Sequence, residues 1–270
     1  MDIKSVKIID NRNVKSISAK KMVREAMMKY GFIENHNNAD LVIAIGGDGA
    51  FINALKNTHF NRKSLYVGIH TGHLGFLQEV KVEEIDLLFK TILDGVYKVE
   101  TLSIEQIEVI GEESVQTYYA LNEMVLREQK LKTIKLDVSI NERHLQKFAG
   151  DGIVISTPTG STAYNNSLGG SIIYPSLHTL QVLPLAPLPI TRHYASLKNS
   201  VIVPENMTIS IIPEVEYQRK IHLCVDGQDL EFSYVEKINI TSAKEGINVL
   251  RFNNYDFWER INSKFLKLED

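Results

Sequence analysis

The stretch "IAIGGDGAF", residues 43–51, sets three glycines around one aspartate directly behind a run of aliphatic residues. An apolar run that enters a glycine cluster predicts a strand ending in a tight loop, because glycine tolerates positive φ and lets the backbone approach a ligand closely. Backbone amides at the start of a following helix can hold an anion through unpaired N–H groups and the helix dipole. We therefore expect a phosphate loop made of Gly46, Gly47, Asp48 and Gly49.

Asp48 is an unusual residue for a phosphate loop, since a carboxylate repels phosphate. Its presence is explained if it accepts a proton from an attacking hydroxyl or helps to hold a divalent cation. The alternative is that Asp48 only supports a turn, as aspartates beside glycine often do. The loop does not match G-x-G-x-x-G, because Ile52 stands at the third glycine, and the chain contains no G-x-x-x-x-G-K-[ST]. Neither a standard Rossmann dehydrogenase nor a P-loop enzyme is indicated.

The residues around this loop alternate between strand-like and helical runs from Met1 to about Val99, with strand-like runs at 6–9, 41–45 and 65–69. In the helical run 16–31 we expect Ser16 as the cap, Gly31 as the stop and an apolar face of Ile17, Met22, Val23, Ala26 and Met27. The run 82–95 has the apolar set Ile85, Leu88, Phe89 and Ile92 before Gly95. This alternation predicts an α/β domain over residues 1–99 with a Rossmann-like open sheet.

After residue 99 the pattern changes to short alternating runs, which predict a β-rich, sandwich-like domain over residues 100–248. The runs are 103–110, 117–126, 133–140, 200–204, 207–212, 220–225, 230–235 and 237–242. Three prolines in "LQVLPLAPLPI", residues 180–190, favour an extended connection there. The final run, 255–270, is helical in pattern, and we expect residues 249–270 to return to the first domain with Phe257, Trp258, Ile261, Phe265 and Leu266 as the apolar set.

The composition is that of a soluble globular protein, with 44% apolar and 23% charged residues in a chain of 270. The net charge of −3 gives no indication of nucleic acid or an anionic membrane as a partner. Cys224 is the only cysteine, which excludes an internal disulfide and favours a reducing, cytoplasmic location. The start, "MDIKSVKIID", lacks the continuous apolar core of a signal peptide.

Two further glycine-rich segments are candidate binding loops. The first is "GIHTGHLGF", residues 68–76, where His70 and His73 have no third ligand nearby, so no metal site is predicted. The second is "AGDGIVISTPTGSTAYNNSLGGS", residues 149–171, which gathers hydroxyls, an amide and an aromatic ring on a Pro and Gly turn. A helix cap needs only one of the hydroxyls, so the segment fits better with a nucleoside or sugar held by several directed hydrogen bonds.

These motifs, together with "LNE" at residues 121–123, occur in the same order in the NAD kinase family, which this chain resembles from about Asp40 to its terminal "FW" element. "TPTGSTAY" is highly specific for that family, whereas "GGDG" also resembles the loop of diacylglycerol and sphingosine kinases. The resemblance implies the same fold order: an α/β domain, a β-rich domain and a returning carboxyl-terminal segment.

The resemblance implies transfer of a phosphoryl group from ATP or polyphosphate to the 2′-hydroxyl of the adenosine ribose of NAD, giving NADP. It implies Asp48 as the catalytic proton acceptor, Mg²⁺ supplied with ATP, and a homotetramer; with the single cysteine and the net charge, we expect a cytoplasmic protein without a nucleic acid or membrane partner. The NAD contacts that it implies are Gly49, His73, Phe76, Asn122, Glu123, Asp151, Ser161, Thr162, Ala163, Tyr164, Asn165, Ser167, Ala186, Asp226 and Gly227. Asp226 and Gly227 also have the pattern of a two-residue hairpin turn.

The chain departs from the family pattern at Ala149, where members usually carry arginine, and at Ala50, where they usually carry threonine. Lys147 is not an equivalent of the arginine, since it lacks the fork-shaped guanidinium. Two alternatives to the NAD kinase stay open at this point. One is a lipid kinase, for which no basic amphipathic helix is found, and the other is a sensor that binds NAD without turnover.

Overall fold

The structure is a computed structural model that describes residues 3–72, 75–130, 132–189 and 193–266. The chain divides into two compact units. Unit 1 consists of residues 1–101 and 247–270, and unit 2 of residues 102–246. No helix in the described ranges is long and apolar enough to cross a membrane.

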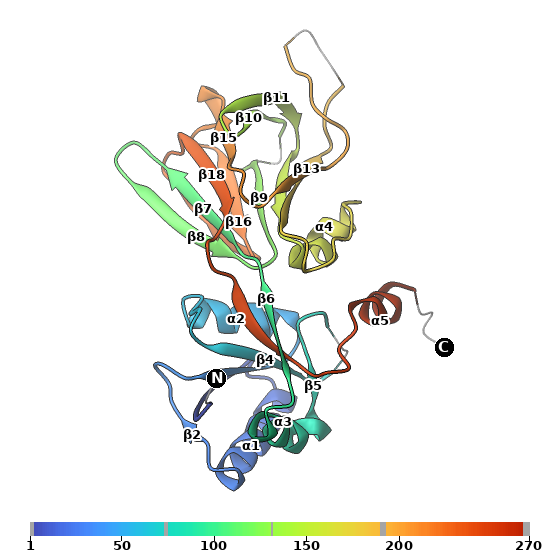
Figure 1. Cartoon of the computed structure of the whole chain (residues 1–270). Coiled ribbons are helices and arrows are strands. Elements are labelled where there is room, and N and C mark those ends of the chain that lie inside the picture. Colours follow the sequence, from blue (N-terminus) through green and yellow to red (C-terminus); the bar gives the residue numbers. More distant parts are fainter. Residues whose placement is uncertain (1–2, 73–74, 131, 190–192, 267–270) are drawn as a thin grey trace. The chain divides into compact units, whose positions relative to one another are not determined.

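Unit 1 is built on a seven-stranded sheet of order β2-β1-β3-β4-β19-β6, with β5 beside β4 (Figure 1). The strands from β1 to β5 and β19 pair in parallel, and Ile8 lies opposite Ile43, which lies opposite Val67. The strands are β1 (Ser5–Asp10), β2 (Ile33–Glu34), β3 (Leu41–Ile45), β4 (Leu65–His70), β5 (Val80–Lys81), β6 (Lys98–Leu102) and β19 (Ile247–Arg251). The α/β prediction for the first part of the chain is confirmed.

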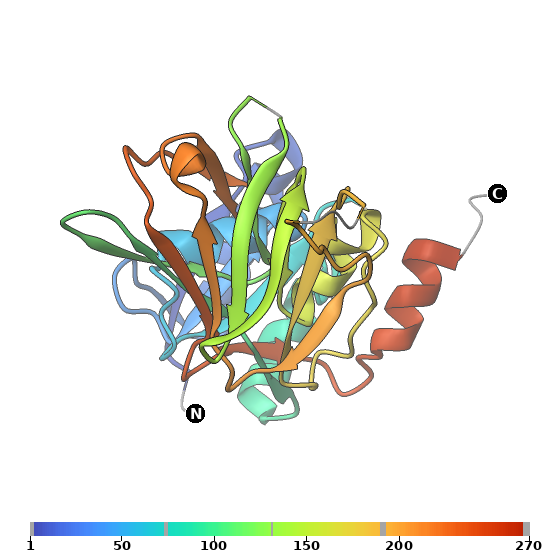
Figure 2. The ribbon, with the colours of Figure 1, turned by 90° about the horizontal axis from the view of Figure 1, so that it is seen from above.

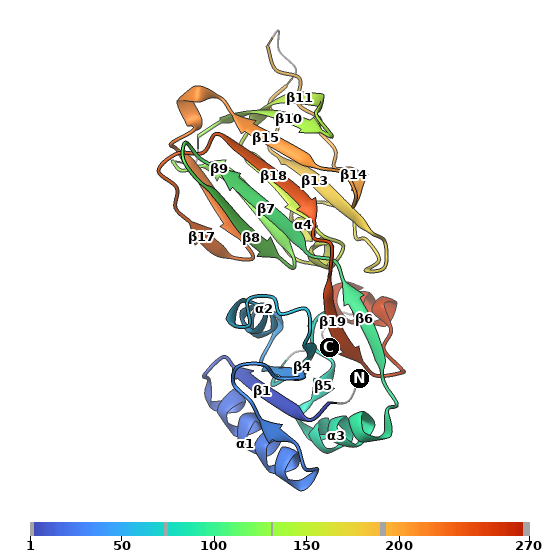
Figure 3. The same cartoon turned by 60° about the vertical axis from the view of Figure 1, so that its left-hand side comes forward.

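Helices cover both faces of this sheet. Helices α1 (Val14–Lys29) and α3 (Ile85–Asp94) lie together on one face, and α2 (Asp48–Asn57) lies on the other (Figure 3). A short 3₁₀ turn, Val82–Glu84, leads into α3. The predicted apolar face of α3 is confirmed in full, and Gly95 ends the helix with a φ of +67°. A left-handed residue at this position is the usual reason for glycine after a helix.

The prediction for α1 was wrong at its start and on part of its face. The cap is Asn13, whose side chain accepts a hydrogen bond from the Ser16 amide at 2.8 Å. Ile17 and Met22 are exposed, and the buried face is made of Ser16, Ala19, Val23, Ala26 and Met27. Small residues at 16 and 19 let the helix lie close to the sheet, so the buried stripe is rotated away from the larger apolar side chains.

Unit 2 consists of two antiparallel six-stranded sheets, of order β11-β10-β15-β18-β7-β8 and β14-β13-β12-β9-β16-β17 (Figures 1 and 2). The first has β7 (Glu105–Ile110), β8 (Val115–Ala120), β10 (Ile134–Ile140), β11 (Arg143–Gly150), β15 (Ile209–Pro213) and β18 (Lys237–Ser242). The second has β9 (Glu123–Glu128), β12 (Gly152–Ser156), β13 (Thr179–Leu185), β14 (Val201–Pro204), β16 (Ile221–Val225) and β17 (Gln228–Leu230). Short helical turns are at Thr159–Thr162, Tyr164–Ser167 (α4) and Val215–Tyr217.

One core joins the inner faces of the two sheets. Strands β7, β10 and β18 alternate buried with less buried residues, and their buried side chains, such as Ile107 and Ile240, share a cluster with Leu126 and Ile155 of the other sheet. Strand β12 is buried along its whole length, because both of its faces are covered. Val154, on the outer face, belongs to a second apolar cluster, and Leu168 of the 149–171 segment packs against that cluster. The sandwich-like prediction is confirmed.

Three strand predictions need correction. Residues 117–126 form two strands in different sheets, because the chain crosses between sheets at Leu121–Asn122. Residues 231–235 are not a strand, since the Asp226–Gly227 turn places β17 at Gln228–Leu230. Residues 180–185 belong to β13 rather than to a connection.

Pro184 is tolerated inside β13 because of its orientation. The Leu185 carbonyl accepts a hydrogen bond from Asp151 on the β12 side, so the backbone of Pro184 faces the other side of the strand. The partner on that side, β14, pairs only with residues 179–182. Proline has no N–H to donate, and at residue 184 none is needed, because among the described residues β13 has no neighbouring strand on that side there.

The carboxyl-terminal segment belongs to unit 1, as β19 in the sheet, α5 (Phe257–Ile261) and a π-helical turn (Asn262–Leu266) that continues α5 (Figure 2). Phe257 and Ile261 are buried against Phe76. Trp258 and Leu266 were predicted as part of the apolar face but are 60% and 71% exposed. The π-helical turn changes the angular spacing of side chains, which displaces Leu266 from the stripe that a regular helix would give.

Candidate active site

The "GGDG" loop connects β3 to α2. Gly46 has a φ of +145°, and a Cβ at this residue would lie 2.7 Å from the Ala50 Cβ, so glycine is required here. Gly47 is the helix cap and Asp48 the first residue of α2, while a Cβ on Gly47 or Gly49 would meet open space. The first amides of a helix have no acceptor within the helix. This end of α2 can therefore direct N–H groups toward an anion.

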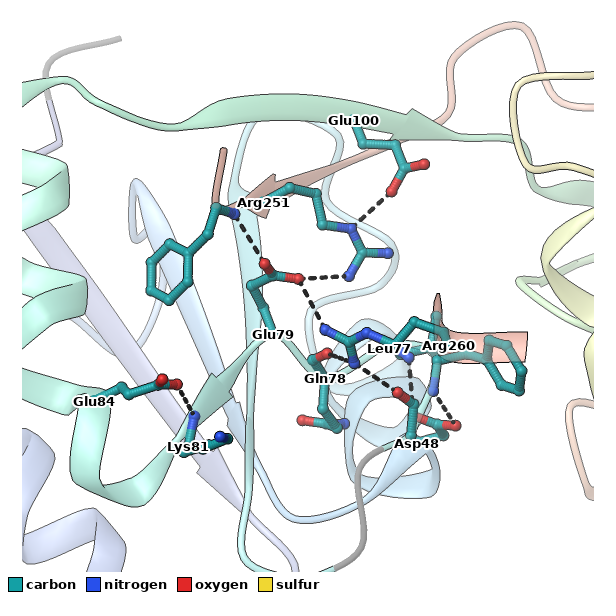
Figure 4. A network of polar contacts seen from close by, with 12 residues as sticks. Asp48, Leu77, Gln78, Glu79, Lys81, Glu84, Glu100, Arg251 and Arg260 are labelled. Carbon is teal, nitrogen blue, oxygen red and sulfur yellow. Dashed lines mark hydrogen bonds and ion pairs between the residues drawn. The ribbon is translucent and has the colours of Figure 1, made fainter. Parts of the chain in front are cut away.

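The Asp48 carboxylate joins this loop to the second glycine-rich loop. Oδ2 accepts a hydrogen bond from the Phe76 amide and Oδ1 from the Leu77 amide, both at 3.0 Å (Figure 4). A Cβ on Gly75 would overlap the carboxylate, so glycine lets the two loops meet. Asp48 therefore supports loop structure, and each oxygen keeps a second lone pair for a proton or a cation.

The second loop contributes its backbone more than its side chains. The Phe76 ring is buried and packs on Phe257 and Phe265, with ring centroids 6.2 and 5.5 Å away. His70 Nδ1 lies 2.9 Å from the Gly72 carbonyl oxygen. His73, a predicted NAD contact, lies outside the described residues.

A buried network of charges lies beside this loop (Figure 4). Glu79 pairs with Arg251 and Arg260 at 3.4 Å each, and Arg251 also bonds to Glu100 at 2.7 Å. Burial raises the pKa of Glu79, and the positive charges of Arg251 and Arg260 oppose the rise. The motifs in the sequence gave no sign of this network, because its members lie far apart in the chain.

In unit 2 the predicted residues Asn122, Glu123 and Asp226 lie together. The Asp226 carboxylate accepts hydrogen bonds from the amides of Leu121, Asn122 and Glu123, at 2.7, 2.8 and 3.2 Å. Asp226 and Gly227 form the predicted hairpin turn, with φ of +47° and +72°. Positive φ at both positions is the geometry of a type I′ turn. Asp226 thus fixes the start of β9.

Two glutamates beside Asp226 hold their protons strongly. Burial, and then the charge of Asp226, raise the pKa of Glu123 to about 8. Burial, followed by the charges of Asp226 and Glu123, raises the pKa of Glu105 well above its usual range, and the Met124 amide opposes the rise. Neither oxygen of Glu105 has a partner of ordinary hydrogen-bond geometry in the described part of the chain. Glu105 was missed, although its alternation with Ile107 and Val109 was a signal that it lies on the buried face.

The "TPTGSTAY" segment uses many of its polar groups internally. The Thr157 amide donates to the Asn122 carbonyl at 2.9 Å, which ties the segment to residues 121–123. Ser161 Oγ donates to the Pro158 carbonyl and accepts from the Ile173 amide, at 2.6 and 2.9 Å. Thr162 Oγ1 donates to the Thr159 carbonyl at 3.1 Å.

The predicted contacts in this segment differ in exposure. Ser161 and Asn165 are fully buried, and the Asn165 Oδ1 has no hydrogen-bond partner among the described residues. Thr162 and Ala163 are half-buried, and Tyr164 and Ser167 are exposed. The Tyr164 hydroxyl accepts a hydrogen bond from Arg127.

Asp151 and Ala186 lie away from this group. Gly152 pairs with Arg127 at one end of the β9–β12 ladder, and Ser156 pairs with Glu123 at the other. Four residues of strand separate the two ends by about 13 Å. Asp151 is exposed, and Ala186 is exposed with a φ of +41°, which is uncommon for a residue with a Cβ. Within unit 2 these two residues therefore do not join Asn122 and Glu123.

The two residues that depart from the family pattern are both buried. Ala149 is bracketed by Ser196, whose Oγ accepts from its amide at 2.9 Å and donates to its carbonyl at 3.2 Å. Ala50 packs beside Gly46. Lys147 is exposed. The described residues contain no group of three or more His, Cys, Asp or Glu side chains that could hold a metal ion.

Comparison with known families gives matches over both units. Residues 5–97 match the ATP-NAD kinase N-terminal domain, and residues 121–252 match the ATP-NAD kinase C-terminal domain. The chain is 37% identical over 270 residues to an NAD kinase of Finegoldia magna, covering 97% of this chain and 98% of the relative. It is 32% identical over 266 residues to an NAD kinase of Staphylococcus epidermidis, again covering 97% and 98%.

Two solved structures share the fold. A yeast NADH kinase in complex with NADH has a TM-score of 0.82 at 19% identity, covering 100% of this chain and 90% of the other. An Archaeoglobus fulgidus NAD kinase in complex with ATP has a TM-score of 0.76 at 21% identity, covering 96% and 99%.

Proposed function

Because the chain belongs to the NAD kinase family and is an enzyme that phosphorylates NAD to NADP, we propose that Asp48 takes the proton of the 2′-hydroxyl of the adenosine ribose as the phosphoryl group is transferred from ATP. The lipid kinase and the non-catalytic sensor are not supported by these relatives. The observation that carries the proposal is the position of the Asp48 carboxylate at the start of α2, held by two amides and beside helix amides that suit phosphate.

The reaction needs alignment, neutralisation of charge and a group that takes the hydroxyl proton. A carboxylate whose two oxygens each accept one amide hydrogen bond is held in one orientation, with lone pairs left for the incoming proton. The N–H groups of Asp48 and Gly49 at the start of α2 would bind phosphate oxygens. Gly46 and Gly47 keep this approach open.

We propose that Mg²⁺ arrives with ATP. Mg²⁺ prefers oxygen ligands and commonly combines one or two carboxylates with phosphate oxygens and waters. When bound, it supplies neutralisation of the charge on the transferred group.

NAD contacts are proposed for the residues that resemble the family motifs, and their exposure suggests different roles. Tyr164, Ser167, Asp151 and Ala186 are exposed and suited to direct contact. Gly49 and Gly227 are exposed as well, and Thr162 and Ala163 are half-buried, so these four are also open to contact. The remaining residues are buried and would shape the binding surface through their backbone or from behind: Phe76, Asn122, Glu123, Ser161, Asn165 and Asp226.

A cytoplasmic homotetramer is proposed for the assembled protein. The unpaired Cys224 suits a reducing compartment. Large exposed apolar side chains on unit 1, including Trp258 and Leu266, offer surface that self-association would cover. Light scattering tests the assembly, and a mass of one chain at all concentrations would contradict it.

The proposed base is tested by assaying NADP formation from NAD, ATP and MgCl₂ with the wild type and Asp48→Asn. Asparagine keeps the shape of the side chain and removes the proton acceptor. We expect NAD to bind the variant and turnover to be lost. Near-normal turnover by the variant would refute the proposed role.

A further inference from the structure

Arg260 of α5 holds the backbone of the loop that holds Asp48. Its Nη1 donates to the carbonyl oxygens of Gly75 and Gln78, at 2.8 and 2.6 Å (Figure 4). The side chain is only 12% exposed, and its Nη2 lies 3.4 Å from the Glu79 carboxylate. A guanidinium suits this task because its fixed fork of donors reaches several acceptors at once.

The guanidinium of Arg260 is itself held in place. Glu79 is fixed by Arg251 and by the Phe252 amide, which donates to its Oε1 at 2.9 Å. The Tyr255 ring lies against both guanidinium groups, with its centroid 4.1 Å from Arg251 and 5.3 Å from Arg260. The orientation of the Arg260 guanidinium is therefore fixed by the buried charged network of unit 1.

The link from Arg260 to Asp48 passes through one peptide group. The carbonyl of Gly75 and the amide of Phe76 belong to the same planar unit, so the direction of one fixes the direction of the other. Arg260 holds the carbonyl, and the Asp48 carboxylate accepts from the amide at 3.0 Å. A hydrogen bond to the carbonyl also polarises the peptide and strengthens the amide as a donor.

We propose that Arg260 is a positioning residue for the phosphoryl transfer, acting through the Gly75–Phe76 peptide to orient the Asp48 carboxylate. The proposal rests on the role of Asp48 as proton acceptor. Arg260 takes no part in the proton transfer itself. Its loss would leave the base present but free to turn, and small misplacements of a reacting group cost up to about 100-fold in rate.

The test compares Arg260→Gln and Arg260→Lys with Glu259→Gln. Glu259 is the neighbouring residue on α5 and is exposed, so it controls for a charge change on the helix. Lysine keeps the charge and the aliphatic stem, but its compact ammonium does not reproduce the fork. Each variant is assayed for kcat, for KM of NAD, and for hydrogen exchange of the Phe76 and Leu77 amides.

We expect both Arg260 variants to lower kcat by about 10- to 100-fold, with KM for NAD changed less than threefold and with faster amide exchange at Phe76 and Leu77. Glu259→Gln should match the wild type in all three. Gly75→Ala acts on Asp48 directly, because its Cβ would overlap the carboxylate, and it shows how far kcat falls when the carboxylate is displaced. If Arg260→Gln does not fold, Arg260→Lys, which keeps the charge and the aliphatic stem, carries the test.

If the Phe76 and Leu77 amides of folded Arg260→Lys exchange at the wild-type rate, the proposal is refuted, whatever the activity of Asp48→Asn. Faster exchange with an unchanged kcat would also overturn it. Asp48→Asn, measured in parallel, then separates the two ideas. An inactive Asp48→Asn leaves Asp48 as the base and refutes only the role of Arg260, whereas an active Asp48→Asn refutes both.

Discussion

Asp226→Asn should weaken unit 2 and its proposed NAD site together, because the carboxylate holds the crossing between the two sheets. Oδ2 accepts from the Leu121 amide, and Oδ1 accepts from those of Asn122 and Glu123. Asparagine keeps one acceptor oxygen and replaces the other with an NH₂ donor. Whichever way it turns, at least one buried amide meets a donor instead of an acceptor.

The expected cost follows from these three bonds. One buried amide without an acceptor costs about 2 kcal/mol, and each remaining bond loses about 1 kcal/mol when its acceptor becomes neutral. Removing the negative charge of Asp226 offsets part of this loss of stability, because that charge repels the carboxyl groups of Glu105 and Glu123 and raises the pKa of both. We expect a net loss of about 3 kcal/mol in the free energy of unfolding, a large part of the 5–15 kcal/mol typical of proteins.

Urea unfolding measures this loss, and Asp229→Asn is the matched control. Asp229 follows on the same hairpin, is exposed, and its Oδ1 lies 2.8 Å from His222 Nε2. The midpoint for Asp226→Asn should fall by about 1 M, and KM for NAD should rise, while the control keeps both. An unchanged midpoint for Asp226→Asn, or an equal fall for Asp229→Asn, would show that the Asp226 carboxylate does not stabilise the crossing.

Three further predictions concern the same chemistry. Gly160→Ala should destabilise unit 2 by about 1–3 kcal/mol and raise KM for NAD, because its Cβ would overlap the Asn122 backbone; a wild-type melting curve would contradict this. Glu105 and Glu123 have raised pKa values when folded, so their stabilising contribution is complete below about pH 4.5 and is lost as pH rises through about 8 for Glu123. Unfolding free energy should therefore fall with rising pH, and Glu105→Gln should flatten that slope by up to about 1.4 kcal/mol per pH unit; an unchanged slope would count against the buried carboxyl. EDTA should abolish NADP formation and MgCl₂ should restore it, whereas activity in EDTA would exclude the proposed Mg²⁺–ATP.

The sequence predicted the elements whose signals are local. The α3 prediction was correct because Ile85, Leu88, Phe89 and Ile92 keep a regular spacing and Gly95 marks a left-handed end. In α1 the same reasoning chose the wrong face at Ile17 and Met22. Periodicity weighs large apolar side chains, whereas the buried face here is made partly of small residues that let the helix lie close to the sheet.

Contacts between distant residues were beyond reach of the motifs. Asp226 had the pattern of a hairpin turn, but nothing in its neighbours indicates that it binds amides 103 to 105 residues away. Arg260 contacts carbonyls 182 and 185 residues away, and nothing in the residues next to it in the sequence indicates these contacts. Glu105 was the exception, since an acid in phase with buried Ile107 and Val109 was visible in the sequence.

The hydroxyls of residues 157–162 were interpreted as ligand contacts, but several bond within their own segment. Ser161 is buried and bonds to the backbone of Pro158 and Ile173. Composition identifies hydrogen-bonding groups, while only the folded backbone decides whether a hydroxyl faces the solvent or the chain.

Steady-state NADP formation from NAD, ATP and MgCl₂, measured with an NADP-specific dehydrogenase for the wild type and Asp48→Asn, tests whether Asp48 takes the hydroxyl proton. A general base contributes typically about 100- to 10,000-fold to a rate. We expect NADP formation by the wild type, and a fall in kcat of at least about 100-fold in the variant with KM for NAD nearly unchanged. A variant that turns over at close to the wild-type rate would contradict Asp48 as the proton acceptor.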